Sequence, residues 1–192
     1  MKRYKKRIIV LSIFAMFGCS QDPILQTYTL EIPKIQKVSQ AKYQNKVLKV
    51  SYPQSLLLKM SQEMNFSYSL NDRGTYLNSQ WSNHIAKLLQ GTWIALLSES
   101  QAFKAVLSNS TSIEEDYELE SHVFAFEHKV RGKESFAIVS IQFSFIHVKN
   151  GKLLKSKRFS YQQRTQTIDA KGYAKATNTI LLRLSKDLLR WL

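Results

Sequence analysis

The sequence predicts an α+β domain, with two amphipathic helices packed on one face of a mainly antiparallel sheet. Residues 117–165 contain three long runs of alternating polar and apolar side chains, two of them joined by Asn150-Gly151. Two other segments, 78–100 and 169–192, repeat apolar residues at the 3.6-residue spacing of a helix. Strands and helices therefore come in separate groups along the chain, which is typical of α+β domains.

The composition fits one folded domain behind an export signal. The 192 residues are 44% hydrophobic and include only 6 glycines and 3 prolines, unlike a disordered chain. We expect residues 1–18 to be a lipoprotein signal peptide and residues 19–45 to be a lipidated N-terminus and tether. Residues 46–192 are then long enough to form a single α+β domain with its own hydrophobic core.

The N-terminus supports this division. A basic stretch at residues 2–7 precedes ten largely apolar residues, 8–17, and then Gly18-Cys19. The apolar run is about half of the roughly 20 residues that a membrane-spanning helix needs. Cys19 is the only cysteine, so it has no partner for an internal disulfide. The pattern resembles a bacterial lipoprotein, which implies that the Cys19 sulfur carries a diacylglycerol. The alternative is an ordinary signal peptide that contains a thiol.

In the first half of the mature chain we expect short elements. Residues 28–30 and 47–52 alternate polar and apolar side chains, and a proline ends the second of these strands. The leucines and methionines of residues 55–64 fit one face of a short helix. Residues 66–70 alternate again and precede a turn at 71–74, which is rich in Asn, Asp and Gly.

Two segments are predicted to be longer helices. The apolar face of residues 78–100 contains Trp81, Ile85, Leu88, Leu89, Trp93, Leu96 and Leu97. A short strand is expected after it, at 103–107. The face of residues 169–192 contains Tyr173, Ala176, Ile180, Leu184, Leu188 and Trp191. Lys186 and Arg190 near the C-terminal end of this second helix stabilise it, because their positive charges interact favourably with the helix dipole.

The three runs between these helices, 117–130, 134–149 and 152–165, are expected to be consecutive antiparallel strands. Apolar residues occupy alternate positions, which predicts one buried face and one wetter face. Asn-Gly is a strong signal for a two-residue hairpin turn, because both residues accept positive φ.

Counting back from that turn gives a register for the last hairpin. It places Phe145 opposite Ser156 and Phe143 opposite Arg158. Arg158 would then lie on the apolar face, so we expect a bulge or a sheet edge to accommodate it.

The net charge is strongly positive. Removal of the five basic residues of the signal leaves 23 basic and 14 acidic residues, a net charge of +9. Nucleic acid is excluded as a partner because the chain is predicted to be exported. An anionic membrane surface is the expected partner, since each basic residue near it contributes about 1 kcal/mol. The alternative is a solvated basic surface without a partner.

No group of residues has the pattern of an active site. The four histidines (84, 122, 128 and 147) lack the spacing of a metal site with carboxylates or a thiol. His122 and His128 would share one face of a strand at a separation of about 20 Å, so we interpret the histidines as surface residues. Glu114–Asp116 is interpreted as a solvated turn rather than an acid–base pair. We therefore expect no catalytic residue, cofactor or metal ion, and predict that the protein is not an enzyme.

The layout resembles one known family, the ABC-type transport auxiliary lipoproteins. The resemblance rests on the signal ending at Cys19, Tyr28-Thr29-Leu30, Leu48-Lys49-Val50, Tyr68, Trp81-Ser82 with the leucines after it, and the closing amphipathic helix. Residues 55–64 depart from the family pattern. Members accompany MCE-domain systems, Mla-like or Pqi-like, that move lipids between the two membranes of a Gram-negative envelope. The resemblance implies a periplasmic domain that binds the transport machine or its lipid, without enzyme activity.

The expected partners are an MCE-domain protein, the ABC transporter components, anionic lipid and the membrane that holds the anchor. Ser20, rather than Asp, follows the cysteine, which favours the periplasmic face of the outer membrane over the inner membrane. Two other functions stay open: a structural or assembly lipoprotein of the outer membrane, and an envelope enzyme.

Overall fold

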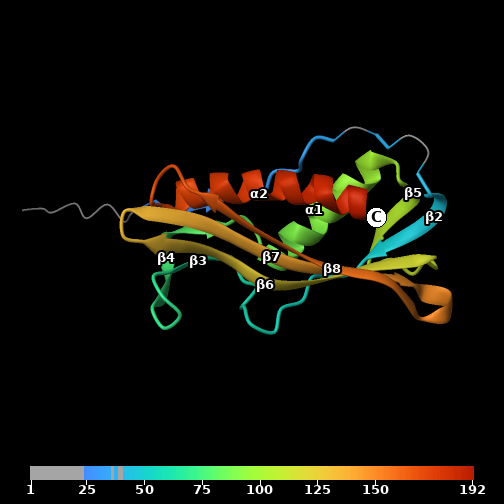
Figure 1. The fold of residues 1–192 in the computed structure, drawn as a ribbon, viewed down its shortest axis with the longest axis horizontal. Helices are drawn as coiled ribbons and strands as arrows, with labels where there is room; N and C mark the ends of the chain where they lie inside the picture. The colour runs from blue at the N-terminus through green and yellow to red at the C-terminus, as the bar shows by residue number, and fades with distance from the viewer. Residues whose placement is uncertain (1–23, 36, 39–40) are drawn as a thin grey trace, which may run out of the picture.

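The computed structural model describes residues 24–35, 37–38 and 41–192. These residues form a curved sheet of eight strands, with two helices covering one of its faces (Figure 1). The elements in chain order are β1 (Gln26–Tyr28), β2 (Tyr43–Val50), β3 (Glu63–Ser67), β4 (Arg73–Trp81), α1 (Ile85–Ser100), β5 (Phe103–Ser108), β6 (Tyr117–Arg131), β7 (Glu134–His147), the 3₁₀ turn η1 (Val148–Asn150), β8 (Lys152–Arg164) and α2 (Ala170–Trp191). The α+β class and its two covering helices are confirmed.

Strand β6 is the centre of the sheet. It pairs antiparallel with β7, and β7 pairs antiparallel with β8. The other edge of β6 is shared: β2 pairs in parallel with its first residues, Tyr117–Leu119, and β3 pairs in parallel near its end, at His128 and Lys129. The sheet therefore branches into two arms, β2–β5 at one end of β6 and β3–β4–β1 at the other.

The sheet is mixed, which corrects the expectation of a mainly antiparallel one. The pairs β1–β4, β2–β5, β2–β6 and β3–β6 are all parallel. A parallel pair needs a crossover connection of a dozen or more residues, and α1 lies in the connection between β2 and β5. Turn motifs in the sequence predict antiparallel pairing between consecutive strands only. They give no information on the parallel pairs, whose strands are far apart in the sequence.

The first helix is shorter than predicted, because residues 73–81 form β4 and α1 begins at Ile85. Trp81 ends the strand and is buried, with its ring 5.8 Å from that of Phe126 and 5.5 Å from that of Tyr173. Its helical spacing relative to the later apolar residues is coincidental. The helical prediction holds within α1, where the buried positions include Ile85, Leu89, Trp93, Leu96 and Leu97.

Residues 55–64, expected to be a short helix, contain none. They form bends that lead into β3, where Met64 is fully buried. β3 ends at Ser67, three residues before the predicted end of the strand. The apolar residues of this segment are divided between core and solvent, because Met64 faces the core whereas Leu56 and Leu57 are exposed.

The register of the β7–β8 hairpin differs by one residue from the prediction. The turn is the longer η1 followed by Gly151 at φ 63°, and it places Phe145 opposite Lys155 and Phe143 opposite Lys157. A shift of one residue moves every side chain to the other face of a strand. Arg158 consequently pairs with Gln142, away from the helices, and needs no accommodation on the apolar face.

A β-bulge at Phe124 reverses the faces of β6. Val123 pairs with Ile141 and Ala125 pairs with Ser140, which leaves Phe124 as an extra residue. Before the bulge the odd-numbered residues are buried, and after it the even-numbered ones are. His122 and His128 therefore lie on opposite faces, and the prediction that they share one is wrong.

The core lies between the helices and the sheet, and α2 supplies much of it. Its predicted apolar face is confirmed: Tyr173, Ala176, Ile180, Leu184 and Leu188 are buried, and Trp191 packs at the margin. Asp169 caps the helix, with its Oδ1 accepting a hydrogen bond of 2.6 Å from the Gly172 amide. Only glycine fits at 172, since a Cβ would lie 2.3 Å from the Thr167 carbonyl oxygen.

Part of the segment expected to be a tether packs against the domain. β1 pairs with β4 from Gln26 onwards, and Leu30 is buried in the core. Further along, the amide of Val38 donates a hydrogen bond of 2.9 Å to the carbonyl of Ser100. The described chain is therefore held to the sheet within a few residues of its start.

His128 is a buried core residue, which corrects its interpretation as a surface histidine. Its Nδ1 lies 2.6 Å from the hydroxyl of Tyr76 on β4, and its ring stacks on that of Tyr173 in α2, with a centroid distance of 5.2 Å. Burial lowers the pKa of His128 from 6.5 to about 4. The neutral ring therefore joins the β3–β4–β1 arm to α2.

We predict that His128 makes the domain less stable in mild acid. Between pH 6.5 and about 4 the unfolded chain binds a proton at His128 that the folded chain does not, so stability falls as the pH is lowered. The slope from one such group is at most about 1.4 kcal/mol per pH unit. Urea unfolding at several pH values between 4.5 and 7 gives the free energy of unfolding as a function of pH. This free energy should change less with pH in His128→Gln than in the wild type. An equal dependence on pH in both proteins would mean that another group causes the loss of stability in acid.

We also predict that α2 is required for stability. Leu184 is fully buried, whereas Leu182 on the same helix is 38% exposed. Truncating a buried leucine to alanine costs about 2–5 kcal/mol. Leu184→Ala should therefore lower the thermal midpoint strongly and Leu182→Ala only slightly, as followed by circular dichroism. Equal effects of the two changes would contradict this packing.

Candidate functional site

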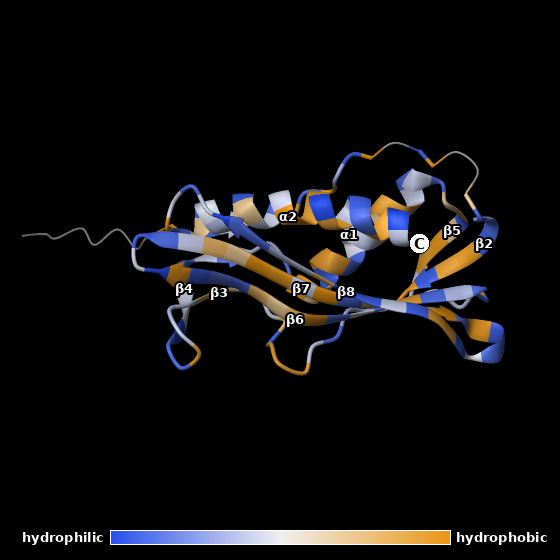
Figure 2. Ribbon diagram, in the orientation of Figure 1, coloured by the Kyte–Doolittle hydropathy of each residue, from blue (hydrophilic) through white to orange (hydrophobic). Residues whose placement is uncertain are grey.

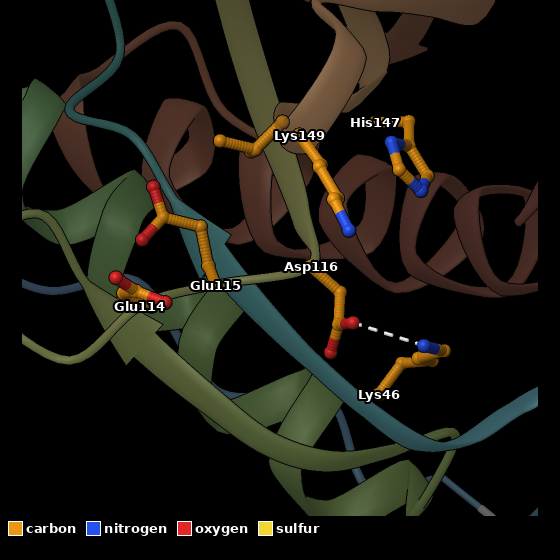
Figure 3. Close-up of a pocket in the computed structure, with 7 residues that line it drawn as sticks. Lys46, Glu114, Glu115, Asp116, His147 and Lys149 are labelled. Carbon is orange, nitrogen blue, oxygen red and sulfur yellow. Dashed lines mark hydrogen bonds and ion pairs between the residues drawn. The ribbon is translucent and has the colours of Figure 1, made fainter.

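An open cleft lies at the end of the sheet where β6 begins and β7 ends (Figure 3). Its volume is about 670 Å³, and its lining residues are Lys46, Glu114, Glu115, Asp116, His147, Val148 and Lys149. The acidic run comes from the loop before β6, Lys46 comes from β2, and His147 with Lys149 comes from the end of β7 and the turn after it. The fold thus collects charges of both signs at this end of the sheet.

The carboxylates of this cleft are engaged in structural contacts. Asp116 accepts a hydrogen bond of 2.9 Å from the Val47 amide and forms an ion pair of 2.9 Å with Lys46. These two contacts lower the pKa of Asp116. Glu115 pairs with Lys49 at 2.7 Å, and its side chain is only 12% exposed, so the expectation of a fully solvated turn is wrong for this residue.

This arrangement does not resemble an acid–base pair. A catalytic pair needs one carboxyl group whose pKa is raised and another whose pKa is not. Here the resolved shift, at Asp116, is downwards, and each of the two ion-paired carboxylates has its own lysine. The contacts instead fasten the loop before β6 to β2.

The other sequence-predicted features are dispersed. In the described part of the chain, no three residues of the types His, Cys, Asp and Glu come close enough together to hold a metal ion. His84 precedes α1, His122 lies midway along β6, His147 lines the cleft and His128 lies in the core. Cys19 is outside the described residues, so its lipidation stays a prediction.

Strand β8 was predicted, but the length and basic character of its free edge were not. Within the described residues β8 pairs with β7 alone, so its outer edge presents backbone N–H and C=O groups over the length of a 13-residue strand. Basic residues recur along it, at Lys152, Lys155, Lys157, Arg158 and Arg164, and it contains no acidic residue. Such an edge is a template for a partner strand, and lysines restrict indiscriminate pairing.

The basic residues of β8 differ in their contacts. Lys155 donates a hydrogen bond of 2.8 Å to the Leu192 carbonyl and so holds the end of α2, while Arg164 forms an ion pair of 3.0 Å with Glu134. Among the described residues, Lys152, Lys157 and Arg158 form no ion pair. β8 is therefore the candidate contact for an acidic partner.

Comparison with solved structures supports the fold. The chain is similar to protein XCC0632 from Xanthomonas campestris, with 18% identity over 87% of this chain and 93% of that one and a TM-score of 0.73. It is also similar to an uncharacterized protein, with 16% identity over 87% and 97% of the two chains and a TM-score of 0.67. The comparison with curated proteins gave no match.

None of the described helices is both long and apolar enough to cross a bilayer. The sequence model of a lipoprotein family matches residues 28–188, which is most of the chain and includes β2 to β8 and most of α2. The chain belongs to the family of ABC-type transport auxiliary lipoprotein components.

Proposed function

We propose that the protein is a membrane-anchored accessory lipoprotein of an MCE-type ABC lipid transport system, and that it acts by binding the transport machine or its lipid. The family match over residues 28–188 is the observation that carries this proposal. The carboxylates of Glu115 and Asp116 in the cleft support a binding role over a catalytic one, because each is held in a structural ion pair.

The proposed location is the periplasmic face of the outer membrane, with Cys19 as the anchor. The support is the sequence of the N-terminus, where Cys19 follows a basic and then an apolar stretch and is followed by Ser20. A single acyl chain binds a bilayer only marginally, whereas two or more chains hold a protein stably. The anchor would keep the domain where the transport machine meets the membrane.

β8 is the proposed contact with the protein partner. Its free edge could extend the sheet by one strand, and its unpaired lysines would attract an acidic segment. Attraction between such charges is long-ranged at low salt and is screened beyond about 10 Å at 0.1 M salt. Binding through β8 should therefore weaken as salt is added.

The first prediction from this proposal concerns the anchor. Cys19→Ala removes the only thiol and should leave an unprocessed or soluble protein. Membrane fractionation after a high-salt wash, with mass spectrometry of the product, measures both effects. If the variant stays with the membranes at the mature mass of the wild type, Cys19 is not the lipidated residue.

The second prediction concerns the partner. Deleting the gene should give the same detergent sensitivity as deleting a neighbouring MCE-domain gene, and the purified proteins should associate. Lys152→Glu combined with Lys157→Glu should weaken this association roughly tenfold at low salt. The matched control is Lys175→Glu with Lys186→Glu, which makes the same charge change on exposed positions of α2.

Two outcomes would count against this proposal. If the double deletion is clearly worse than either single deletion, the two proteins act in separate pathways, and an assembly role at the outer membrane becomes the better explanation. If the β8 and α2 variants weaken association equally, net charge matters and β8 is not the contact.

A further inference from the structure

Strand β1 limits how far the domain can stand from its anchor. Gln26–Tyr28 are fixed in the sheet by pairing with β4, and Ile24 is the first described residue. Four residues lie between Cys19 and Ile24 in the sequence, and the five steps from one to the other span at most about 18 Å even in a fully extended chain. With Cys19 lipidated, as proposed above, the β3–β4–β1 arm must therefore lie close to the bilayer.

The most exposed large hydrophobic side chains of the described residues gather on this same arm and its loops. Leu56 is 95% exposed, Leu77 90%, Ile24 87% and Leu70 81%. Leu25 and Leu57 are exposed as well, and we call these six residues the leucine surface. Figure 2 shows the loops before β3 and before β4 projecting from the sheet on the side away from the helices, with hydrophobic residues in them.

Three residues of the leucine surface, Leu25, Leu57 and Leu77, line two hollows that share Lys59. Leu25 and Leu77 line one hollow together with Lys59. Lys59 also lines a second hollow, in which it meets Leu57 and Arg73. The segment before β1, the loop before β3 and strand β4 thus place apolar side chains next to basic ones. This combination suits the headgroup and acyl boundary of a bilayer.

Leu77 lies in a large bulge of the β3–β4 pairing. Glu63 pairs with Gln80 and Asn65 pairs with Thr75, so four residues of β4 lie opposite one residue of β3. Within this bulge Tyr76 turns inwards to His128, whereas its neighbour Leu77 is left in solvent. The alternation of β4 from Arg73 to Leu77 thus places this leucine on the exposed face of the strand.

From these observations we propose that the leucine surface is a membrane-contacting surface, which inserts into the leaflet that holds the lipid anchor. The partner is a bilayer because the short connection from Cys19 brings this arm to one, and because exposed apolar clusters of this kind mark interaction sites. The domain then rests on the membrane on its β3–β4–β1 arm. The β7–β8 turn lies at the opposite end of the molecule and stays free for a protein partner (Figure 1).

The test uses the full-length lipoprotein in vesicles of phosphatidylethanolamine and phosphatidylglycerol. Cys19 is the only cysteine, so a lipidated protein offers no thiol, and Leu56→Cys and Leu77→Cys each introduce a single site for an environment-sensitive fluorophore. Leu153→Cys is the matched control, because it is 54% exposed and lies at the β7–β8 turn. Lipids with brominated acyl chains quench a label that enters the bilayer.

We expect a blue shift and loss of emission at positions 56 and 77, and neither change at 153. Adding Leu77→Asp to the variant labelled at 56 should reverse much of the quenching there. Quenching at 56 and 77 no greater than at 153 would overturn the proposal, as would a blue shift without quenching, which would indicate contact between copies. Labelling of the wild-type protein would instead show a free Cys19 and overturn the anchor on which the proposal rests.

Discussion

Strand β6 must pair with other strands along both of its edges and, at the same time, direct its apolar side chains towards the core along its whole length. One edge pairs with β7, while the other is divided between β2 at its start and β3 near its end. A straight strand of 15 residues would bury one fixed set of alternating side chains. The bulge at Phe124 changes that set, so that Leu119 and Val123 before it and Phe126 and Val130 after it all reach the core. The branched sheet depends on this single inserted residue.

The two arms that β6 supports have different chemical properties. The β2–β5 arm carries ion pairs that fasten the loop before β6, and the cleft beside it is polar. The β3–β4–β1 arm carries exposed leucines and receives the chain from Cys19. The free basic edge of β8 is on the far side of β7 from both arms. This separation suits the proposed role, in which the domain contacts a membrane and a protein partner at the same time.

Much of the fold could be predicted from the sequence because its signals are local. The capping aspartate and apolar spacing of α2, the alternation in β7 and the core of α1 each depend on neighbouring residues. The predictions were wrong where contacts between residues distant in sequence determine the secondary structure or the burial of a residue. Trp81 belongs to a strand because Phe126 and Tyr173 enclose it, and His128 is buried because a bulge turns it inwards. The exposed edge of β8 could not be predicted with certainty either. It depends on how all the other strands pair, which the sequence does not specify locally.

We propose that this lipoprotein works by binding a transport machine. The most direct measurement is to cross-link the native protein in intact cells, isolate it from membranes and identify its partners by mass spectrometry. The account predicts recovery of an MCE-domain protein together with its ABC transporter components. Recovery of outer-membrane assembly proteins alone, unchanged in a strain that lacks the MCE-domain gene, would contradict it.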